Sequence, residues 1–553
     1  MDRRTGWIHR IGAIAVGGTA LVLALSGCGL LAGNRPPVAV AEASPTEGDA
    51  PLTVQFDGTR SFDEDDLIAS YEWSFGDGTS ASGATVERSF AKEGLYRVRL
   101  TVTDQFGARD TDTVEITVGN PPPQAVLTAS STSGWAPLGV AFDASASFDP
   151  ADDPIVDYEW TFGDGIEADG VRVRHRYEQP GHYATTLRVT DDGGASSEAT
   201  VDVYALDFAT LDLADVEPGS SPTDLLAEDF DGDGELDVAV AASESNEVRL
   251  LFGQATTDGF AEGIRLRAGR RPVALASADI NRDGRPDLAA ANLDSGDVSV
   301  YLNRGGRQFD VLPRIRIGRW AATLEFGQFT DDDVPDLVVS DPETHRILVL
   351  RGDGDGGFTE SATVENTIRW PSSFVVRDFN GDGQDDLAVA GFLANMVAVL
   401  AGDGAGGVSA STTYDVGAGP LSLHAGDLND DNIPDLVTAN SKEGTFSILI
   451  GDQRGRFDVM RTVSAGGGVR SLIVADVDGD GVPDLASANS RDATITVHLN
   501  GGSGNFSPDG MRLFPVTDEP TALVAADFDD SGFMDVLAIH FEAEQLTLLS
   551  NRL

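Results

Sequence analysis

The sequence contains a single cysteine, Cys28, so no disulfide bond can form within the chain. It contains only two lysines, Lys92 and Lys442, so a catalytic lysine has almost no candidates. Basic residues number 38 against 90 acidic residues, which gives a formal net charge of −52 at pH 7. Nucleic acids and anionic membrane surfaces repel a polyanion of this density, and we therefore expect no nucleic-acid partner.

Long hydrophobic runs are also missing, except for one near the N-terminus. This run spans residues 11–25 and includes three glycines. It is shorter than the roughly 20 apolar residues that a membrane-spanning helix needs, which disfavours an uncleaved membrane helix. A basic start precedes the run, and Leu25-Ser-Gly-Cys28 follows it.

These residues resemble a bacterial lipoprotein signal, in which the cysteine becomes the lipidated first residue of the mature protein. The resemblance implies that residues 1–27 are a signal peptide and that residues 28–35 comprise the lipidated Cys28 and a tether. Gly29 follows the cysteine in place of an Asp, which resembles the outer-membrane rather than the inner-membrane sorting of Gram-negative lipoproteins. We expect a lipid-anchored protein of the cell envelope, at the outer membrane or cell surface, that contacts the membrane only through its anchor.

Aspartate, in contrast, is abundant and regularly spaced. The stretch Asp229-Phe-Asp-Gly-Asp-Gly-Glu-Leu-Asp237 places carboxylates at offsets zero, two, four and eight, and the pattern recurs about every 50 residues. Such a period is typical of propellers, solenoids and arrays. The side chains at the four offsets are Asp229, Asp231, Asp233 and Asp237; Asp279, Asn281, Asp283 and Asp287; Asp378, Asn380, Asp382 and Asp386; Asp427, Asn429, Asp431 and Asp435; Asp476, Asp478, Asp480 and Asp484; and Asp527, Asp529, Ser531 and Asp535. A degenerate copy, the third of seven, has Gln328, Thr330, Asp332 and Asp336.

Several carboxylates in one small turn indicate a bound cation. Two unit charges about 4 Å apart repel by roughly 4 kcal/mol at an effective dielectric of about 20, and a cation removes this repulsion. Ligation by oxygen alone favours a hard ion, and a flexible loop suits calcium better than magnesium. The Asp-Gly pairs could instead be simple hairpin turns, but six copies with the last aspartate in register favour metal binding. An EF-hand is disfavoured, because it needs a glutamate at the twelfth position and flanking helices.

The repeats resemble the FG-GAP (VCBS-type) repeat, which is best known from the seven-bladed β-propeller of integrin α-subunits. Each copy has an apolar segment before and after the Asp loop, an alternating third segment and a fourth after a Gly-rich turn, which fits one four-stranded blade. The resemblance implies that side chains at offsets zero, two, four and eight bind calcium, together with the backbone carbonyl at offset six. The offset-six residues are Glu235, Arg285, Gln384, Ile433, Val482 and Phe533. We expect about six calcium sites, one per blade except the third.

Two related units precede the repeats. Tyr71-Glu-Trp-Ser-Phe-Gly-Asp-Gly78 in the first matches Tyr158-Glu-Trp-Thr-Phe-Gly-Asp-Gly165 in the second. Alternating apolar residues between Gly, Asp and Pro predict the strands of a β-sandwich, with the two tryptophans as buried anchors. The units resemble the PKD domain, an immunoglobulin-like sandwich that serves as an extracellular spacer or interaction module. We expect an all-β chain with PKD domains at residues 36–118 and 119–205 and a seven-bladed β-propeller at residues 206–553.

The two ends of the repeat region predict how it closes. The last repeat stops after its third strand, at residues 547–553, whereas residues 208–219 read as a fourth strand that belongs to no repeat. We hypothesise that these segments pair and complete the seventh blade, which would remove exposed sheet edges.

The sequence leaves no block for a catalytic domain. It contains no His-Glu-x-x-His, no Gly-x-Ser-x-Gly and no phosphate-binding glycine loop, so we expect no enzymatic activity. We interpret the tripeptide Arg351-Gly-Asp353 as a chance occurrence. The expected function is that of a surface binding or adhesion protein whose propeller recognises an extracellular protein or glycan. The alternatives are a structural or assembly component of the envelope and an accessory protein, or less favourably an enzyme, acting on extracellular polysaccharide.

Overall fold

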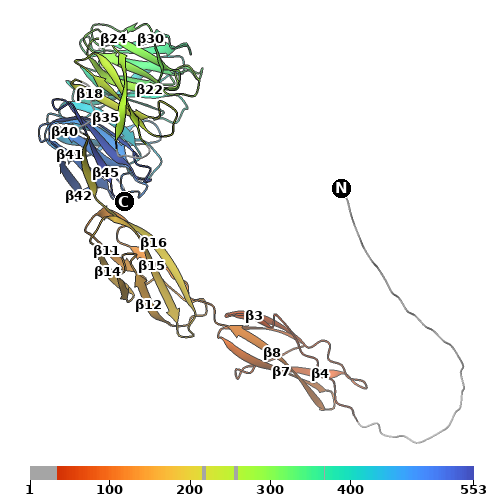
Figure 1. Cartoon of the computed structure of the whole chain (residues 1–553). Helices are drawn as coiled ribbons and strands as arrows, with labels where there is room; N and C mark the ends of the chain where they lie inside the picture. Colours follow the sequence, from red (N-terminus) through yellow and green to blue (C-terminus); the bar gives the residue numbers. More distant parts are fainter. Residues whose placement is uncertain (1–33, 214–219, 255–258, 366–367, 503) are drawn as a thin grey trace, which may run out of the picture. The chain divides into compact units, whose positions relative to one another are not determined.

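The computed structural model describes residues 34–213, 220–254, 259–365, 368–502 and 504–553, and the regular secondary structure in these ranges is β-strand (Figure 1). The predicted signal peptide and Cys28 lie outside the described residues, so the lipid anchor stays a prediction. From residue 34 onward, no described helix is long and apolar enough to cross a membrane. The chain divides into two compact units: the first holds the first sandwich with two loops of the second, and the other holds the rest.

The first sandwich packs a three-stranded sheet against a five-stranded sheet around one core. Trp73 is fully buried in that core, and its indole Nε1 donates a hydrogen bond to the carbonyl of Gly83 at 3.1 Å, as expected for a buried anchor. In sheet order, the strands are β1 (Glu42–Ser44), β3 (Leu52–Asp57) and β6 (Thr85–Phe90), and then β2 (Glu47–Asp49), β8 (Arg109–Gly119), β7 (Gly94–Asp104), β4 (Ile68–Ser74) and β5 (Ser80–Ser82).

The second sandwich repeats this topology. Trp160 occupies the position of Trp73 and donates to the carbonyl of Gly170 at 2.8 Å. In both sandwiches, the glycines of the Gly-Asp-Gly turn have left-handed backbone conformations, which explains why the motif needs glycine there. The strands are β14 (Arg172–Tyr177), β11 (Leu138–Asp143) and β9 (Thr128–Ala129), and then β10 (Ser133–Trp135), β16 (Ser196–Leu206), β15 (Gly181–Asp191), β12 (Ile155–Thr161) and β13 (Glu167–Asp169).

The repeat region folds into seven antiparallel sheets. In chain order, they consist of β18 (Pro222–Glu228), β19 (Asp237–Ala242), β20 (Glu247–Gly253) and β21 (Phe260–Arg267); β22 (Pro272–Ala278), β23 (Asp287–Asn292), β24 (Asp297–Asn303), β25 (Phe309–Val311) and β26 (Ile315–Arg316); β27 (Leu324–Gly327), β28 (Asp336–Asp341), β29 (Arg346–Gly352) and β30 (Phe358–Glu365); β31 (Pro371–Arg377), β32 (Asp386–Gly391), β33 (Met396–Gly402) and β34 (Val408–Asp415); β35 (Pro420–Gly426), β36 (Asp435–Asn440), β37 (Thr445–Gly451) and β38 (Phe457–Ser464); β39 (Val469–Ala475), β40 (Asp484–Asn489), β41 (Thr494–Asn500) and β42 (Phe506–Pro515); and β43 (Pro520–Ala526), β44 (Asp535–His540) and β45 (Gln545–Asn551) with β17 (Phe208–Leu213).

The second strand of every sheet is buried along its whole length. These strands are short runs of Val, Leu, Ala and Ile that begin with an aspartate, so both of their faces can pack against neighbouring sheets. Adjacent sheets share hydrophobic clusters; for example, Val238 and Val240 of the first sheet pack with Leu537 and Ile539 of the seventh. The core of the repeat region therefore lies between the sheets.

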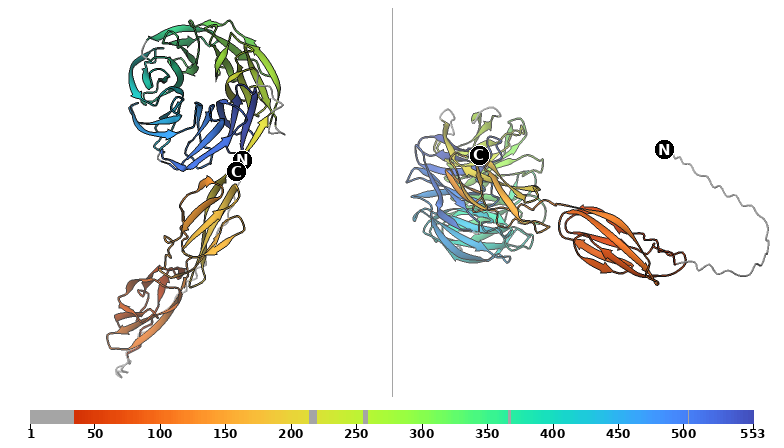
Figure 2. Two further views of the ribbon diagram at one scale, coloured as in Figure 1. Left: turned by 90° about the vertical axis from the view of Figure 1, so that its left-hand side faces the viewer. Right: turned by 90° about the horizontal axis from the view of Figure 1, so that it is seen from below.

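Each of the seven sheets is an open path of strands, and the sheets follow one another around a ring (Figure 2, left). The first strand of each sheet contacts the first strand of the next, and β18 of the first sheet contacts β43 of the seventh. The strand predicted from residue 208 pairs with the last strand in antiparallel register, from Phe208 opposite Asn551 to Leu213 opposite Leu546. The remainder of that predicted segment, residues 214–219, lies outside the described ranges.

The second sandwich contacts the sixth and seventh sheets. The Trp135 ring packs against Phe208 and Phe514, and its Nε1 donates to the carbonyl of Gly510 at 2.8 Å. The Arg512 guanidinium lies over the same indole and pairs with Asp207 at 2.9 Å. This contact was not predicted, because nothing in the local sequence around Trp135 reveals a partner about 375 residues away.

Candidate metal centres in the aspartate loops

Each aspartate loop joins the first and second strands of its sheet. The offset-eight aspartate is the first residue of the second strand in all seven sheets, from Asp237 in β19 to Asp535 in β44. These seven carboxylates are buried, with at most 1% of the residue exposed. All seven repeats therefore place a buried carboxylate at the end of the loop.

The buried aspartate braces the loop with both carboxylate oxygens. One oxygen accepts a hydrogen bond from the backbone N–H at offset one, at 2.9–3.0 Å in all seven loops. The other accepts from the backbone N–H of the residue 16 positions further along, at 2.7–3.0 Å. The sequence predicted this aspartate only as a metal ligand, and the structure adds a role in pairing buried backbone amides.

The offset-zero aspartate folds the loop over itself. In the six intact copies, its carboxylate accepts the backbone N–H at offset five, at 2.6–3.0 Å. The residue at offset five has a positive φ in each copy, including Asn432 at 61°. Glycine and asparagine tolerate this left-handed conformation, which explains the residue types found there.

Carboxylate oxygens converge in three of the loops. In the first, sixth and seventh loops, oxygens from offsets zero, two and eight lie within 4.8 Å of one another. These groups are Asp229, Asp231 and Asp237; Asp476, Asp478 and Asp484; and Asp527, Asp529 and Asp535. The offset-four carboxylates, Asp233 and Asp480, are not members of these groups. The structure thus brings together three of the four predicted side-chain ligands in these loops.

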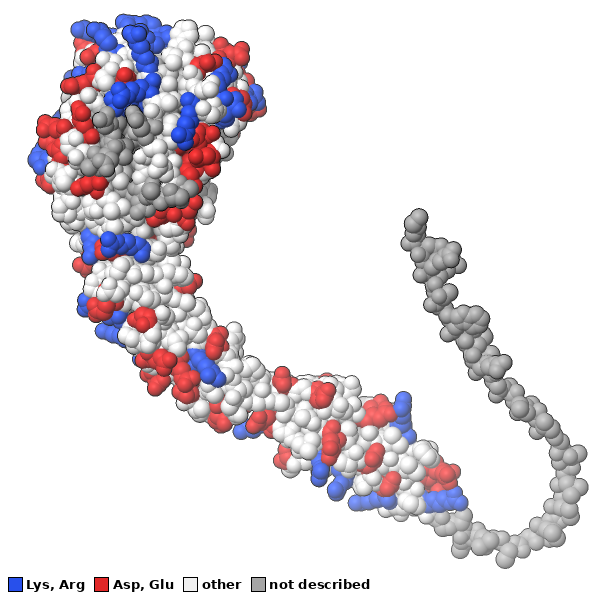
Figure 3. Space-filling model, viewed as in Figure 1, with Lys and Arg blue, Asp and Glu red and all other residues white. Residues whose placement is uncertain are grey.

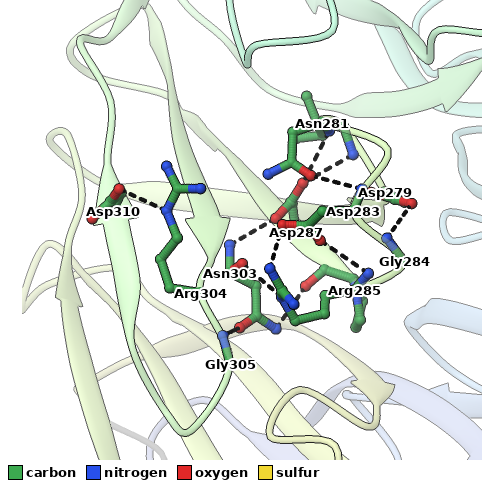
Figure 4. A network of polar contacts seen from close by, with 12 residues as sticks. Asp279, Asn281, Asp283, Gly284, Arg285, Asp287, Asn303, Arg304, Gly305 and Asp310 are labelled. Atoms are coloured by element: carbon green, nitrogen blue, oxygen red, sulfur yellow. Dashed lines mark hydrogen bonds and ion pairs between the residues drawn. The ribbon is translucent and has the colours of Figure 1, made fainter.

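The second, fourth and fifth loops have asparagine at offset two, so fewer carboxylates meet there. Figure 4 shows the second loop, in which Asp279, Asn281, Asp283 and Asp287 gather around the turn. The amide of Asp283 is held by the side chains of both Asp279 and Asn281, at 2.8 and 3.0 Å. The predicted ligands therefore lie in one compact loop.

At offset six, the structure shows a contact of the backbone amide. Its N–H donates to the offset-four side chain, at distances from 2.8 Å for Ile433 and Val482 to 3.3 Å for Phe533. The carbonyls of these residues, from Glu235 to Phe533, stay predicted ligands.

Burial destabilises the ionised form of the offset-eight aspartates, and a nearby positive charge would stabilise it. Removal from water raises the pKa of Asp237 and Asp535 to about 7 and of Asp287 and Asp435 to about 6. Burial, and then the neighbouring Asp478, also raises the pKa of Asp484. A hard cation would offset both the burial and the repulsion, so the oxygen donors present fit calcium.

Arginines supply part of this charge in the first two loops. Arg307, from the turn after β24, pairs with Asp231 of the preceding sheet at 2.7 Å and lies over the Phe252 ring. Arg285 pairs with Asp283 at 2.6 Å in its own loop. The sequence did not predict the first pair, because its partners come from different repeats.

The degenerate third loop is paired with an arginine, Arg351, which lies near the end of β29 in the same sheet. Arg351 pairs with Asp332 at 2.6 Å, and this hydrogen bond holds the pKa of Asp332 below its usual value. The hydroxyl of Thr330 lies 2.9 Å from a carboxylate oxygen of Asp332 and 3.0 Å from one of Asp336, so its single proton can be donated to either. The carboxylates of Asp332 and Asp336 therefore have partners within the protein. The ion pair with Asp332 also gives Arg351 a structural role that does not involve adhesion through the Arg-Gly-Asp tripeptide.

Asp336 lies in the loop that is not expected to bind metal, so its two hydrogen bonds to backbone amides can be tested separately from metal binding. We expect Asp336→Ala to destabilise the repeat region by about 2–6 kcal/mol, because two buried backbone N–H groups lose their acceptor at roughly 1–3 kcal/mol each. The loss should be the same in calcium and in chelator. The control Asp332→Ala breaks a partly exposed ion pair and two hydrogen bonds, from Thr330 and from the Val334 amide, and leaves both bonds of Asp336 to buried backbone amides in place, so it should cost less than Asp336→Ala. Chemical denaturation measures both variants, and equal losses would contradict the brace.

Links between neighbouring loops were also missed by sequence reasoning. The side-chain amides of Asn303, Asn500 and Asn551 donate to the offset-one carbonyl in the preceding sheet, at 2.7, 2.9 and 2.7 Å. The available signal was asparagine at offset 24 in three repeats, where the other four have glycine. These bonds tie the first, fifth and sixth loops to the sheet that follows each of them.

The chain consists of two β-sandwiches followed by seven sheets whose first two strands are joined by acidic loops. This architecture places the protein in the class of all-β repeat proteins with candidate cation sites. A profile of the FG-GAP-like repeat matches residues 229–290, 279–339, 328–389, 378–438, 427–487 and 476–538. These six matches cover more than half of the chain, which therefore belongs to the FG-GAP-like repeat family. A profile of the PKD domain matches residues 34–118 and 120–205, which confirms two PKD domains.

Curated relatives match part of the chain. The pre-pro-metalloprotease PrtV of Vibrio cholerae is 36% identical over 172 residues, which are 31% of this chain and 18% of that protein. The dyslexia-associated protein KIAA0319 of Homo sapiens is 33% identical over 188 residues, which are 31% of this chain and 17% of that protein. The chain thus spans less than a fifth of the length of these relatives.

Solved structures match separate parts of the chain. The PKD1 domain of Vibrio anguillarum Epp is 39% identical with a TM-score of 0.15, and the match covers 16% of this chain and 99% of that one. BBS1N in complex with ARL6DN is 18% identical with a TM-score of 0.45, and the match covers 62% of this chain and 95% of that one.

Proposed function

We propose that the protein is a lipid-anchored, cell-surface binding protein in which two PKD domains support a seven-bladed β-propeller. The observation that carries the propeller assignment is the succession of neighbouring first strands, from β18 through each sheet to β43 and back to β18. Pairing of β17 with β45 supplies the fourth strand of the seventh sheet from the opposite end of the region. Both features support a ring with no free edge strand between its ends.

Calcium would act as scaffold in this protein. It would be held by the side chains at offsets zero, two, four and eight and the carbonyl at offset six in six loops. Bound there, calcium supplies positive charge that offsets repulsion among the carboxylates. Three converging carboxylate groups and the raised pKa values of the buried aspartates support this assignment.

Three of the six described histidines have contacts that support a binding role over catalysis. His175 pairs with Asp164 and stacks on Phe162, and His540 is buried against Thr547. His498 is buried against Phe446, and burial lowers its pKa to about 4. These contacts are those of structural residues, so we propose a protein without enzymatic activity.

A binding screen tests this function. The purified chain, in calcium, is applied to arrays of extracellular glycans and envelope proteins. We expect at least one saturable ligand whose binding is lost in chelator, because the loops shape the ends of the sheets. A chain that binds nothing on either array would favour the structural or assembly alternative, and turnover of a polysaccharide would favour an enzyme.

A further inference from the structure

Two tryptophans stand apart from every buried cluster in the described chain. Trp73 and Trp160 fill the sandwich cores, and Trp135 packs between the second sandwich and the repeat region. Trp320 and Trp370 lie instead on the connectors before β27 and β31, partly exposed, with ring centroids 5.6 Å apart. Two partly exposed indoles in contact on adjacent connectors need a reason other than core packing.

Trp370 also has a strained backbone. Its φ is +60°, in the left-handed region, and the matching positions before β35 and β39 are Gly419 and Gly468 with φ of 69° and 72°. Ser221 and Arg271 share the conformation before β18 and β22, but Trp370 is the bulky aromatic residue among them. A large side chain kept where glycine suffices is a sign of function.

Basic residues lie next to the two tryptophans in the sequence and in a neighbouring turn. Arg319 and Arg369 directly precede them in sequence. Lys442, in the turn between β36 and β37, has its ammonium 4.2 Å from the ring centroid of Phe392, which lies in the turn between β32 and β33. The connector and turn are joined, since the amide of Phe392 donates to the carbonyl of Trp370 at 3.0 Å. The aromatic–basic surface comprises Arg319, Trp320, Arg369, Trp370, Phe392 and Lys442.

This concentration of positive charge is unusual for a chain of net charge −52 that contains two lysines. Arg319 is well exposed and forms an ion pair with Glu343 at 3.2 Å. Figure 3 shows basic side chains gathered over the part of the repeat region where Figure 1 labels β24 and β30. Arg319, Arg369 and Lys442 would attract an acidic ligand that the net charge of the chain repels elsewhere.

The aromatic–basic surface lies at the end of the sheets opposite the aspartate loops. Trp370 immediately precedes β31, whereas the aspartate loop follows that strand. The second sandwich contacts the loop end, where Tyr204 packs against Phe533 and Ser133 bonds to Asp478. The second sandwich therefore leaves the aromatic–basic surface uncovered.

We propose that the aromatic–basic surface binds a linear, carboxylated polysaccharide. The C–H faces of sugar rings pack on the indoles, and the arginines and lysine pair with uronate carboxylates, which a guanidinium can bind through two hydrogen bonds. A protein partner fits less well, because Leu393 is the one strongly exposed large aliphatic residue among the described connectors and turns of the third to fifth sheets, at 42%. The inference rests on the proposed binding function and specifies its ligand class.

Calorimetry of the purified chain with uronate oligosaccharides tests the inference. The probes are oligosaccharides from alginate, polygalacturonate and hyaluronan, with neutral dextran and poly-glutamate as comparisons. We expect at least one uronate to bind, with affinity reduced about tenfold or more by Trp320→Ala and by Trp370→Gly. Trp370→Gly suits the left-handed backbone, so its melting temperature should not fall.

The matched control is Phe541→Ala. Phe541 occupies the position of Phe392 in the seventh sheet, where Glu519 stands in place of Trp370 and the surroundings are acidic. This variant should bind like the parent. The inference is overturned if no uronate binds, if both tryptophan variants bind normally, or if poly-glutamate alone shows the same dependence. A ligand from the arrays that binds independently of these tryptophans would leave the broader function standing.

Discussion

Removing divalent cations with a chelator is expected to lower the unfolding temperature of the repeat region by many degrees. A ligand present at 100 times its Kd stabilises the folded state by about 2.7 kcal/mol per independent site. Each kcal/mol shifts the midpoint by roughly 2–4 °C for a domain of about 150–250 residues, and by less, about 1–2 °C, for a region as long as residues 206–553. Several aspartate loops would therefore add up to a shift far above the error of a calorimetric or fluorescence melt.

A matched pair of variants assigns this shift to the loops. Asp431→Ala removes the offset-four carboxylate of the fifth loop, and Asp332→Ala removes its counterpart in the third. The first should reduce the stabilisation by calcium by about the share of one site. The second should leave it unchanged, because Arg351 already pairs with Asp332. If the two substitutions reduced the stabilisation by calcium equally, the assignment of calcium to particular loops would be wrong.

Deleting residues 207–213 is expected to abolish cooperative unfolding of the repeat region. The segment contains β17, which supplies the fourth strand beside β45 and places Leu211 and Leu213 against the cluster between the first and seventh sheets. Phe208 of the same strand is buried, and full burial of such a side chain contributes about 1.5–3 kcal/mol; the two partly buried leucines contribute less each, and β45 would also gain an unpaired edge.

Urea unfolding followed by fluorescence and circular dichroism measures this effect. We expect a broad transition at lower denaturant concentration, with probes that no longer coincide. The control Thr210→Ser changes an exposed residue of the same strand and should unfold like the parent. A deletion variant that keeps the parent's sharp transition would show that β17 is dispensable.

The sequence predicted the parts of the structure that repeat. Aspartates at fixed offsets fall in register because the glycine or asparagine at offset five is left-handed in all six intact loops. The strand at residue 208 was predictable because the last repeat lacked its fourth strand. The division of the second sheet's outer strand into β25 and β26 also has a sequence cause, since Pro313 lies between them and lacks a backbone N–H.

Contacts between distant residues could not be predicted. Such contacts depend on how the sheets are placed. Examples are the hydrogen bond from the Asn551 amide to the carbonyl of Val477, the ion pair of Arg307 with Asp231, and the hydrogen bond from Trp135 to Gly510. The brace made by each offset-eight aspartate was missed for a related reason. An acidic residue at a ligand position gives no sign that backbone amides share its oxygens.

The central claim is that the regularly spaced aspartates hold metal ions. Elemental analysis of the purified chain after exhaustive exchange into trace calcium tests it most directly. The account predicts about six calcium ions per chain, falling by about one in Asp431→Ala and by none in Asp332→Ala. A chain that retains no stoichiometric metal under these conditions would contradict the account.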